Sequence, residues 1–382
     1  MRLTSKIAKI VAIPNTGISL KEDSLYLAKS DVDFFNELGH FYEFSIAGIV
    51  VETNNAFHSM PINCPYHNLS VIKSQGKKSK LRIYVETFIN AISLIRKQTL
   101  FYLYFPSSPL LVILPLLIIS RSPYALYLRA DWQRRGKILT TINKFFFKHA
   151  QFILCTGPQL VKQLNNLNIK AEMVVPMTGL LNNNAAEKSD YSIKNTSNLL
   201  FVGRLTFEKG ILELLDALNS LNKQGVDFNM HFVGPLDEAI KNQFEEKIGQ
   251  YGLHDHIIMH GQVTDPAQLA RHYAQSDLFV FPSHHEGFPR VIYEAMAHAL
   301  PIVTTQLPYL EALLEKGDEI CTIPINNANK LSESIFQALN DEPLRKYLGT
   351  SSNHIFKVLM SKLKYTSHAQ QVHSKIQYLH AS

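Results

Sequence analysis

The chain alternates short apolar stretches with segments of helical periodicity over most of its 382 residues. Apolar stretches separated by helices are typical of parallel strands, because helices then cover both faces of the sheet. The alternation therefore predicts an α/β fold. In the first half, we expect strands at 7–13, 43–51, 81–86, 100–105, 124–128, 152–156 and 173–175.

A polar stretch, LNNNAAEKSDYSIKNTSN at 181–198, interrupts the alternation and has the composition of a linker. The pattern then restarts. Expected strands lie at 199–203, 230–233, 257–259, 278–281 and 302–304, and expected helices start near 210 and span 236–249, 266–275 and 289–298. At roughly 100–200 residues per domain, we predict two doubly wound domains, 1–180 and 199–361. Ligands of such sheets bind where loops leave the carboxyl ends of strands, and two facing sheets form a cleft.

Residues 98–120 are free of charge and long enough to span a membrane. Pro106, Pro109 and Pro115 interrupt the stretch, so we predict a buried strand, a turn and a buried helix instead. The three cysteines lack metal or disulfide spacing, and the first residues do not resemble an export signal. These features favour a cytoplasmic protein.

Charge is divided unevenly along the chain. Residues 1–180 hold 21 Lys and Arg against 10 Asp and Glu, whereas residues 181–382 hold 17 against 22. Solvated loops would explain any single basic run, such as KSQGKKSKLR at 73–82. The excess over a whole domain favours an anionic partner, either a membrane surface or a phosphate-bearing acceptor. Nucleic acid is not expected, because the basic runs lack interleaved aromatic residues and known nucleic-acid motifs.

The loop after the expected strand 199–203 carries two cations. Gly203 permits a close backbone turn, Arg204 and Lys209 follow, and a helix begins near Gly210. Two cations beside a helix N-terminus suit a phosphate group. The alternative is that both are ordinary surface charges, but their position after a strand favours the phosphate site.

The loop after the expected strand 278–281 carries two carboxylates. Glu286 lies in the loop, Pro289 suits the first helical position, and Glu294 lies in the helix. The free backbone N–H groups between Gly287 and Arg290, which Pro289 lacks, and the two carboxylates could bind the hydroxyl groups of a sugar and of a ribose. A solvated Glu294, a Glu286 that only complements the helix dipole, and a glycosidase pair are the alternatives. The neighbouring cations favour a nucleotide sugar.

The second half of the chain resembles glycosyltransferases of the GT-B fold, family 4. The motifs are FVGRLTFEKG at 201–210, HFVGP at 231–235 and the segment from HGQVTD to PIVTT at 260–305, which contains Glu286 and Glu294. The resemblance implies two Rossmann-like domains that face each other across a cleft. It also implies that residues 362–382 form a helix that returns to the first domain.

The resemblance assigns roles to individual residues. Arg204 and Lys209 would bind the donor diphosphate, Glu286 the donor sugar and Glu294 the ribose. The expected donor-binding set is Gly203, Gly234, Gln262, Val263, Gly287, Phe288, Pro289, Arg290 and Glu294. The implied reaction transfers a sugar from a UDP- or GDP-linked donor to an acceptor hydroxyl, with retention of configuration and without a metal or other cofactor.

The first half matches this family only in its alternation of strands and helices. Gly17 stands alone where relatives carry two glycines, and Asp131 stands where they carry His-Asp. Asp131 is the candidate catalytic group of this half, and Gly17, Arg129 and Trp132 are candidates for the acceptor side. A structural aspartate and a core tryptophan are equally consistent with the pattern.

Two patterns that could suggest a metal site are interpreted differently. Asp31 and Asp33 precede a helical pattern and not a buried strand, so we expect them at a helix start. His284 and His285 lack metal-ligand spacing.

Synthesis of polysaccharide, lipopolysaccharide or glycolipid at the inner face of the membrane is the expected role. A nucleotide-sugar epimerase or hydrolase, and a noncatalytic membrane scaffold, are the alternatives.

Overall fold

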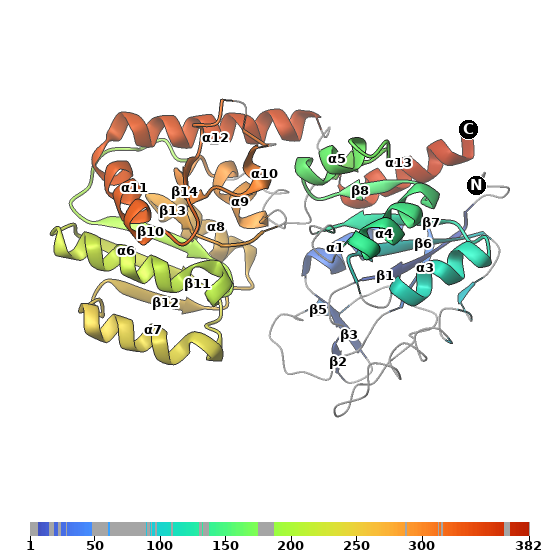
Figure 1. The fold of residues 1–382 in the computed structure, drawn as a ribbon, viewed down its shortest axis with the longest axis horizontal. Coiled ribbons are helices and arrows are strands. Elements are labelled where there is room, and N and C mark those ends of the chain that lie inside the picture. Colours follow the sequence, from blue (N-terminus) through green and yellow to red (C-terminus); the bar gives the residue numbers. More distant parts are fainter. Residues whose placement is uncertain are drawn as a thin grey trace. The chain divides into compact units, whose positions relative to one another are not determined.

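The computed structural model describes residues 7–14, 19–21, 24–27, 29–47, 60–61, 89, 92, 94–95, 98–107, 110–129, 132, 137–174, 187–286, 289–311, 313–314, 316–362 and 367–381. The chain divides into two compact units. The first contains Met1–Met177 and Leu363–Ser382, and the second contains Thr178–Lys362. Each unit is an α/β sandwich with a parallel central sheet (Figure 1).

The first unit has a six-stranded parallel sheet in the order β4-β1-β6-β7-β8-β9. Its strands are β1 (Lys9–Ile13), β4 (Glu43–Ile46), β6 (Thr99–Phe105), β7 (Tyr124–Leu128), β8 (Ile153–Cys155) and β9 (Glu172–Met173). Its helices are α1 (Lys29–Leu38), α3 (Leu110–Ile119), α4 (Lys137–His149), α5 (Pro158–Asn165) and α13 (His368–Ala381). A small antiparallel sheet of β2 (Ser19–Lys21), β3 (Ser24–Leu27) and β5 (Met60–Pro61) was not predicted.

Strand β6 shows why the long apolar stretch forms a strand. Its side chains alternate between the two faces of the sheet, and all are buried. Leu100, Tyr102 and Tyr104 pack with α1 and α13, whereas Phe101, Leu103 and Phe105 pack with α3, α4 and α5. A parallel strand covered on both faces needs such a continuous apolar sequence. Among the described residues, no helix is long and apolar enough to cross a membrane.

Helix α13, at the end of the chain, belongs to the first unit. Ala369, Val372 and Ile376 are buried in the same cluster as the apolar side chains of α1. His368 lies beside them, and its Nε2 is 2.6 Å from the hydroxyl of Tyr102. The end of the chain therefore completes one face of the first sheet.

The second unit has a six-stranded parallel sheet in the order β12-β11-β10-β13-β14-β15. Its strands are β10 (Ser197–Val202), β11 (Phe228–Val233), β12 (Ile257–Gly261), β13 (Leu278–Phe281), β14 (Ile302–Thr305) and β15 (Cys321–Ile323). Its helices are α6 (Ile211–Lys223), α7 (Glu238–Tyr251), α8 (Pro266–Gln275), α9 (Arg290–Ala297), α10 (Pro308–Glu311), α11 (Ala328–Asn340) and α12 (Glu342–Lys362). A short 3₁₀ helix, η2 (Phe207–Lys209), precedes α6.

This strand order defines where a ligand of the second unit would bind. Counted along the chain, the order is 3-2-1-4-5-6, which is that of the Rossmann fold. Helices α6, α7 and α11 lie together on one face of the sheet, and α8 and α9 lie on the other (Figure 1). The connections diverge between β10 and β13, so the loops after these two strands flank the point where doubly wound sheets bind ligands.

The observed elements correspond closely to the predicted ones, with local differences. Helix α9 begins at Arg290, so Pro289 is the N-cap residue and not the first helical residue. The expected strand 81–86 and the end of the expected strand 43–51 lie outside the described residues. Asp31 lies in the first turn of α1, as predicted, but its side chain is buried.

Candidate active site

The loops after β10 and β13 meet at the carboxyl edge of the second sheet. The backbone N–H of His284 donates to the carbonyl oxygen of Glu208 across 2.8 Å. The hydroxyl of Ser283 donates to the same carbonyl oxygen across 3.2 Å. The segment before α6 and the segment before α9 are thus connected by direct hydrogen bonds.

Two glycines allow the backbones at this edge to approach closely. Gly210 has a φ of +67°, and a Cβ on it would lie 2.1 Å from the carbonyl oxygen of Pro282. Gly234, which follows β11, has a φ of +144°, and a Cβ on it would lie 1.9 Å from the carbonyl oxygen of Gly203. Both positions require glycine for backbone conformation and for space.

Lys209 and Glu286 form an ion pair where these loops meet. The Ser283 hydroxyl donates to Glu286 Oε1 across 3.3 Å. The Lys209 ammonium also lies 5.4 Å from the centre of the Phe281 ring. Arg204 is exposed, and within the described part of the chain its side chain has no ion-pair or hydrogen-bond partner. In the described part of these loops, Lys209 is therefore a cation paired with the Glu286 carboxylate, and Arg204 is an unpaired cation.

Two threonines at the end of β14 donate hydrogen bonds to the segment that leads into Glu286. The Thr304 hydroxyl donates to the carbonyl oxygen of Phe281 across 2.7 Å. The Thr305 hydroxyl donates to the carbonyl oxygen of Ser283. Both side chains are buried. These two hydrogen bonds fix the position of the loop.

Glu294 lies in α9 and is only 7% exposed. The hydroxyl of Tyr273, from α8, donates to Glu294 Oε2 across 2.9 Å. Burial, and then the charge of Glu294, raise the pKa of Tyr273 well above its usual range, so this hydroxyl stays protonated. The structure excludes a solvated Glu294.

Gly261 ends β12, Gln262 and Val263 follow it, and all three residues are partly exposed. The backbone N–H of Gly234 donates to the carbonyl oxygen of Gly261 across 2.7 Å. The ladder between β11 and β12 is irregular just before Gly261, where His260 has no paired residue on β11. The predicted donor-binding residues Gln262 and Val263 thus follow a strand that ends at the same edge as Gly203 and Gly234.

Other predicted site residues lie outside the described residues or in the first unit. Gly17, Asp131, Gly287 and Phe288 are outside the described part. Arg129 Nη1 lies 4.0 Å from Asp31 Oδ1, and its guanidinium lies over the rings of Tyr104 and Tyr127. Trp132 is fully buried against Phe147.

The acceptor-side residues therefore have different surroundings from those expected of exposed ligand groups. Arg129 is mostly buried among aromatic side chains, and Trp132 is part of the hydrophobic core. Of the two interpretations of Trp132, the structure supports the core tryptophan. The proposed contact of Arg129 and Trp132 with an acceptor stays a prediction.

Metal-ligating side chains do not converge in the described part of the chain, where no group of three or more His, Cys, Asp or Glu could hold a metal ion. His284 Nε2 lies 3.4 Å from Glu213 Oε1, so this histidine connects the loop to α6. This contact could not be predicted from the sequence, and neither could the roles of Tyr273, Ser283, Thr304 and Thr305.

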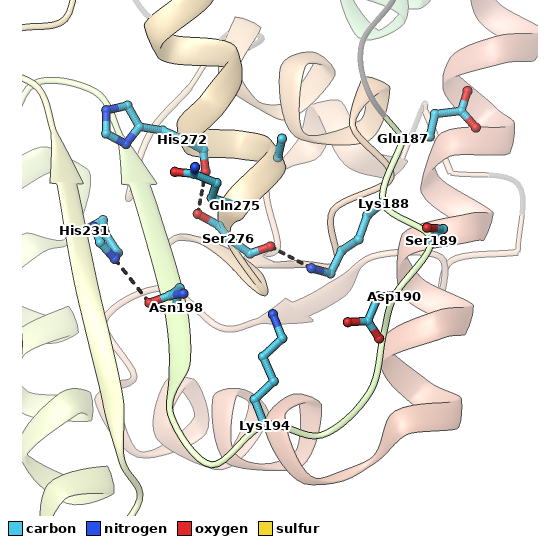
Figure 2. A pocket seen from close by; sticks show the side chains of 11 residues that line it. Glu187, Lys188, Ser189, Asp190, Lys194, Asn198, His231, His272, Gln275 and Ser276 are labelled. Carbon is cyan, nitrogen blue, oxygen red and sulfur yellow. Dashed lines mark hydrogen bonds between the residues drawn. The ribbon is translucent and has the colours of Figure 1, made fainter.

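A cavity of about 570 Å³ lies at the opposite edge of the same sheet. It is lined by residues 187–190, by Lys194 and Asn198, by His231, and by the end of α8 (Figure 2). Because Lys194, Asn198 and Ser276 lie at the amino ends of β10 and β13, the cavity is separate from the loops at the carboxyl edge. We therefore place the candidate active site at those loops and not in this cavity.

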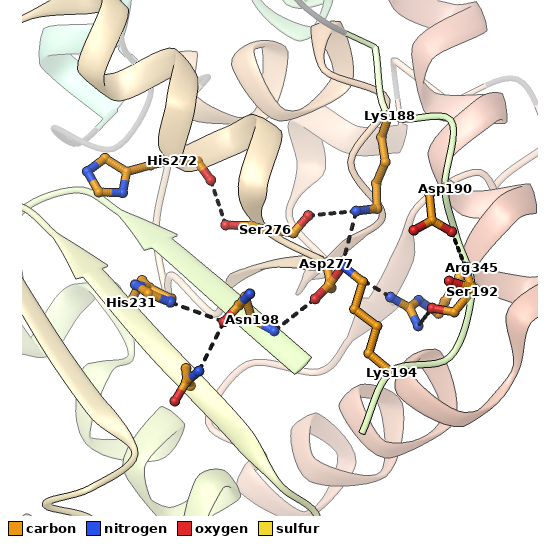
Figure 3. A network of polar contacts seen from close by, with 11 residues as sticks. Lys188, Asp190, Ser192, Lys194, Asn198, His231, His272, Ser276, Asp277 and Arg345 are labelled. Carbon is orange, nitrogen blue, oxygen red and sulfur yellow. Dashed lines mark hydrogen bonds and ion pairs between the residues drawn. The ribbon is translucent and has the colours of Figure 1, made fainter. Parts of the chain in front are cut away.

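Asp277 organises the polar network beside this cavity (Figure 3). Its carboxylate is fully buried and accepts hydrogen bonds from Lys188, Lys194 and the backbone N–H of Asn198. Arg345 Nη2 lies 3.6 Å away. Since Lys188 and Lys194 lie in the segment that precedes β10 in the second unit, Asp277 fastens that segment to the rest of the unit.

The fold of the whole chain is GT-B. A crystal structure of HepE from Anabaena, in complex with UDP and glucose, matches it with a TM-score of 0.69 at 16% identity. The match covers 97% of this chain and 100% of that one. At this identity the likeness shows the fold alone, and it confirms the predicted fold class.

Sequence comparison then relates the second half of the chain to a family. Residues 184–354 match the model of glycosyl transferases group 1. An uncharacterized glycosyltransferase of Methanocaldococcus jannaschii is 28% identical over 219 residues, which cover 56% of this chain and 58% of that protein. The capsular polysaccharide biosynthesis glycosyltransferase CapM of Staphylococcus aureus is 27% identical over 171 residues, 44% of each chain. The chain spans about half the length of the curated relatives it matches.

Proposed function

We propose that this protein is a glycosyltransferase that moves a sugar from a nucleoside diphosphate sugar to a hydroxyl group of a saccharide or lipid-linked acceptor. The observation that carries the proposal is the Lys209–Glu286 pair beside the exposed Arg204, at the divergence point of a Rossmann-like sheet. The match of residues 184–354 to glycosyl transferases group 1 supports the same activity.

In the proposed reaction, the bond between the anomeric carbon and the diphosphate oxygen breaks, a bond to the acceptor oxygen forms, and the proton of the acceptor hydroxyl passes to the departing diphosphate. Negative charge grows on the departing diphosphate. Arg204 and Lys209 would bind this charge more strongly in the transition state than in the ground state. Two cations at the donor site can supply this stabilisation without a metal, and the proposal is metal-independent transfer with retention of configuration.

Glu286 and Glu294 have complementary roles in this proposal. Glu286 is held by Lys209 and Ser283 in the loop and would accept hydrogen bonds from donor-sugar hydroxyls. Glu294 is buried in α9 and would accept hydrogen bonds from the ribose hydroxyls. Asp131 is the proposed catalytic group contributed by the first unit.

For the donor and pathway, we propose a UDP-linked sugar and synthesis of a surface polysaccharide. HepE, which shares the fold, was crystallised with UDP and glucose, and CapM acts in capsular polysaccharide biosynthesis. We further propose that the protein works in the cytoplasm, at the inner face of the membrane. The basic first half of the chain supports an anionic surface or acceptor there.

Thermal unfolding with UDP, GDP and ADP, each with EDTA or Mg²⁺, tests the donor site. We expect stabilisation by UDP that does not depend on Mg²⁺, that is lost in Lys209→Ala, and that is kept in Lys223→Ala. Lys223 is exposed at the far end of α6, so this control removes the same charge away from the site. A ligand at 100 times its Kd stabilises by about 2.7 kcal/mol, which is readily measured.

Product analysis tests the reaction itself. Incubation with UDP-glucose and a panel of saccharide and lipid-linked acceptors should release UDP only with a suitable acceptor, and NMR of the product should show the anomeric configuration of the donor. Release of UDP without any acceptor would support a hydrolase. Failure of every nucleotide to stabilise the protein, or equal losses in both lysine variants, would contradict the proposed donor site.

A further inference from the structure

The buried contact between Tyr273 and Glu294 points to a positioning role. Glu294 is the most deeply buried of the carboxylates assigned to the donor site, with 7% exposure against 14% for the side chain of Glu286. A buried carboxylate is stable only when hydrogen-bond donors face it. Tyr273 supplies such a donor at 2.9 Å from Oε2.

Tyr273 is itself held in place by the helices and strands around it. Its side chain is 1% exposed. One neighbour is His298, whose ring is nearly parallel to that of Tyr273 with centroids 5.5 Å apart. Another is Phe279 of β13, with centroids 5.7 Å apart. Packing against two aromatic neighbours prevents the tyrosine ring from tilting or shifting, so the hydroxyl oxygen has a fixed position.

A fixed donor on Oε2 determines how the Glu294 carboxylate is turned. The torsion at the end of a glutamate side chain is broad, so a carboxylate without such a contact would sample many orientations. An ionised carboxylate has about four acceptor positions. Oε2 can therefore accept from Tyr273 and still accept from a ligand hydroxyl. A carboxylate already turned correctly loses less entropy when it binds a vicinal diol.

We propose that Tyr273 is a positioning residue, which orients Glu294 to bind the ribose hydroxyls of the donor nucleotide. The inference rests on the proposed function, because it assumes that Glu294 meets the ribose. It adds a residue from α8, outside the loops that carry Lys209 and Glu286, that determines how tightly the ribose is recognised. The competing explanation is that the hydroxyl only joins α8 to α9 and contributes to stability.

Calorimetric titration of Tyr273→Phe with two ligands separates these explanations. The ligands are UDP and 2′,3′-dideoxyuridine diphosphate, which lacks both ribose hydroxyls. We expect Tyr273→Phe to weaken UDP roughly five- to tenfold, in line with a hydrogen bond to a charged group, and to leave the dideoxy ligand nearly unchanged. Glu294→Gln should show the same ligand dependence, whereas Lys209→Ala should weaken both ligands alike.

Tyr191→Phe is the matched control. Tyr191 is also buried in the second unit, and its hydroxyl donates to the carbonyl oxygen of Ala299 across 2.9 Å. The control loses one buried hydrogen bond without touching Glu294, so it should lower the melting temperature and leave the ratio of the two affinities unchanged.

The outcomes distinguish the inference from the proposed function. If Glu294→Gln discriminates between the ligands and Tyr273→Phe does not, the positioning role is wrong and the donor site stands. If Tyr273→Phe weakens both ligands equally, the hydroxyl has only a structural role. If wild type binds neither ligand, or if it binds UDP and Glu294→Gln shows no ligand dependence, the assignment of Glu294 to the ribose fails, and the inference with it.

Discussion

At Gly210, the backbone of the loop that carries Lys209 lies directly against the backbone of the loop that carries Glu286. Its φ of +67° disfavours any side chain, and the carbonyl oxygen of Pro282 occupies the space that a Cβ would need. The residue therefore controls whether Lys209 can lie next to Glu286. A change of one methyl group at this position should affect both folding and nucleotide binding.

We predict that Gly210→Ala lowers the free energy of unfolding by more than about 2 kcal/mol and abolishes stabilisation by UDP. The left-handed conformation alone costs a non-glycine residue about 1–2 kcal/mol, and the clash with Pro282 adds to this. Urea denaturation with and without UDP measures both effects.

Gly252→Ala provides the control for this prediction. Gly252 ends α7 with a φ of +63°, but nothing lies within 4 Å of its would-be Cβ. Gly252→Ala should lower the free energy of unfolding only by the conformational cost, and it should keep its response to UDP. Equal effects of the two substitutions would show that the contact with Pro282 is unimportant.

At the residue scale, sequence identified the groups that follow strands directly. Arg204, Lys209 and Glu286 lie in such loops, and the structure brings them to one edge because parallel strands end together. Tyr273 could not be identified in this way. It lies near the end of α8, and only tertiary packing brings its hydroxyl to Glu294.

At the scale of elements, the contacts of the segment 187–194 also could not be predicted from the sequence. Its polar composition indicated a linker, but it makes specific contacts with the rest of the second unit. The side chains of Lys188 and Lys194 bind Asp277, and the backbone carbonyl oxygen of Ser192 accepts from Arg345 (Figure 3). Polar residues that fill such a network and polar residues that face water have the same composition, so sequence alone could not separate them.

We predict that Asp277→Asn lowers the free energy of unfolding by about 3–5 kcal/mol, because it leaves buried cations without their counter-charge. Burial raises the pKa of Asp277, but the Asn198 N–H and the two lysines outweigh it, so the net pKa is lowered. The carboxylate therefore stabilises the fold above its unfolded pKa of about 4 and loses this effect at lower pH.

Urea denaturation between pH 3 and 7 checks this prediction. The difference between wild type and Asp277→Asn should be full at pH 7 and should shrink below about pH 4. Asp190→Asn is the control, since Asp190 is an exposed residue of the same segment. A loss as large in Asp190→Asn would show that the burial of Asp277 is not the cause.

Helix α13 contributes a buried histidine to the first unit. Burial, and then the charge of Arg129, lower the pKa of His368 well below its usual value. The folded protein therefore keeps His368 neutral while the unfolded chain binds a proton. The stabilisation is complete above the unfolded pKa of about 6.5 and is lost as the pH falls towards the folded pKa.

We predict that α13 loses protection against hydrogen exchange as the pH falls below 6.5, by up to about 1.4 kcal/mol per pH unit. Exchange measured at several pH values, corrected for the intrinsic rate, tests this. His368→Gln should be less stable at pH 7.5 but should depend less on pH. His40→Gln, at an exposed site of the same unit, should keep the slope of wild type. An unchanged slope in His368→Gln would contradict the prediction.

For the whole molecule, the two halves differ in charge as well as in motif content. The net charge is +11 for residues 1–180 and −5 for residues 181–382, from the counts of Lys and Arg against Asp and Glu. The strand order of both sheets could be anticipated only as doubly wound, because periodicity gives the order of elements and not their pairing. The charge difference, in contrast, comes directly from the sequence.

We predict that the protein binds vesicles of phosphatidylcholine with phosphatidylserine at low salt and releases them as the salt concentration rises. Each lysine near an anionic membrane contributes about 1 kcal/mol, and screening by salt removes this. A variant with glutamine in place of Lys73, Lys77, Lys78 and Lys80 should bind at least about tenfold more weakly.

The matched control replaces four exposed lysines of the second half, which are Lys223, Lys316, Lys330 and Lys346. It changes the net charge by the same amount, so equal losses in the two variants would show that total charge, and not the basic run of the first half, determines binding. Cosedimentation with vesicles of phosphatidylcholine alone measures the part of the vesicle binding that does not depend on charge. If wild type binds both kinds of vesicle equally, the anionic partner is not a lipid surface, and the phosphate-bearing acceptor is the remaining explanation for the basic half.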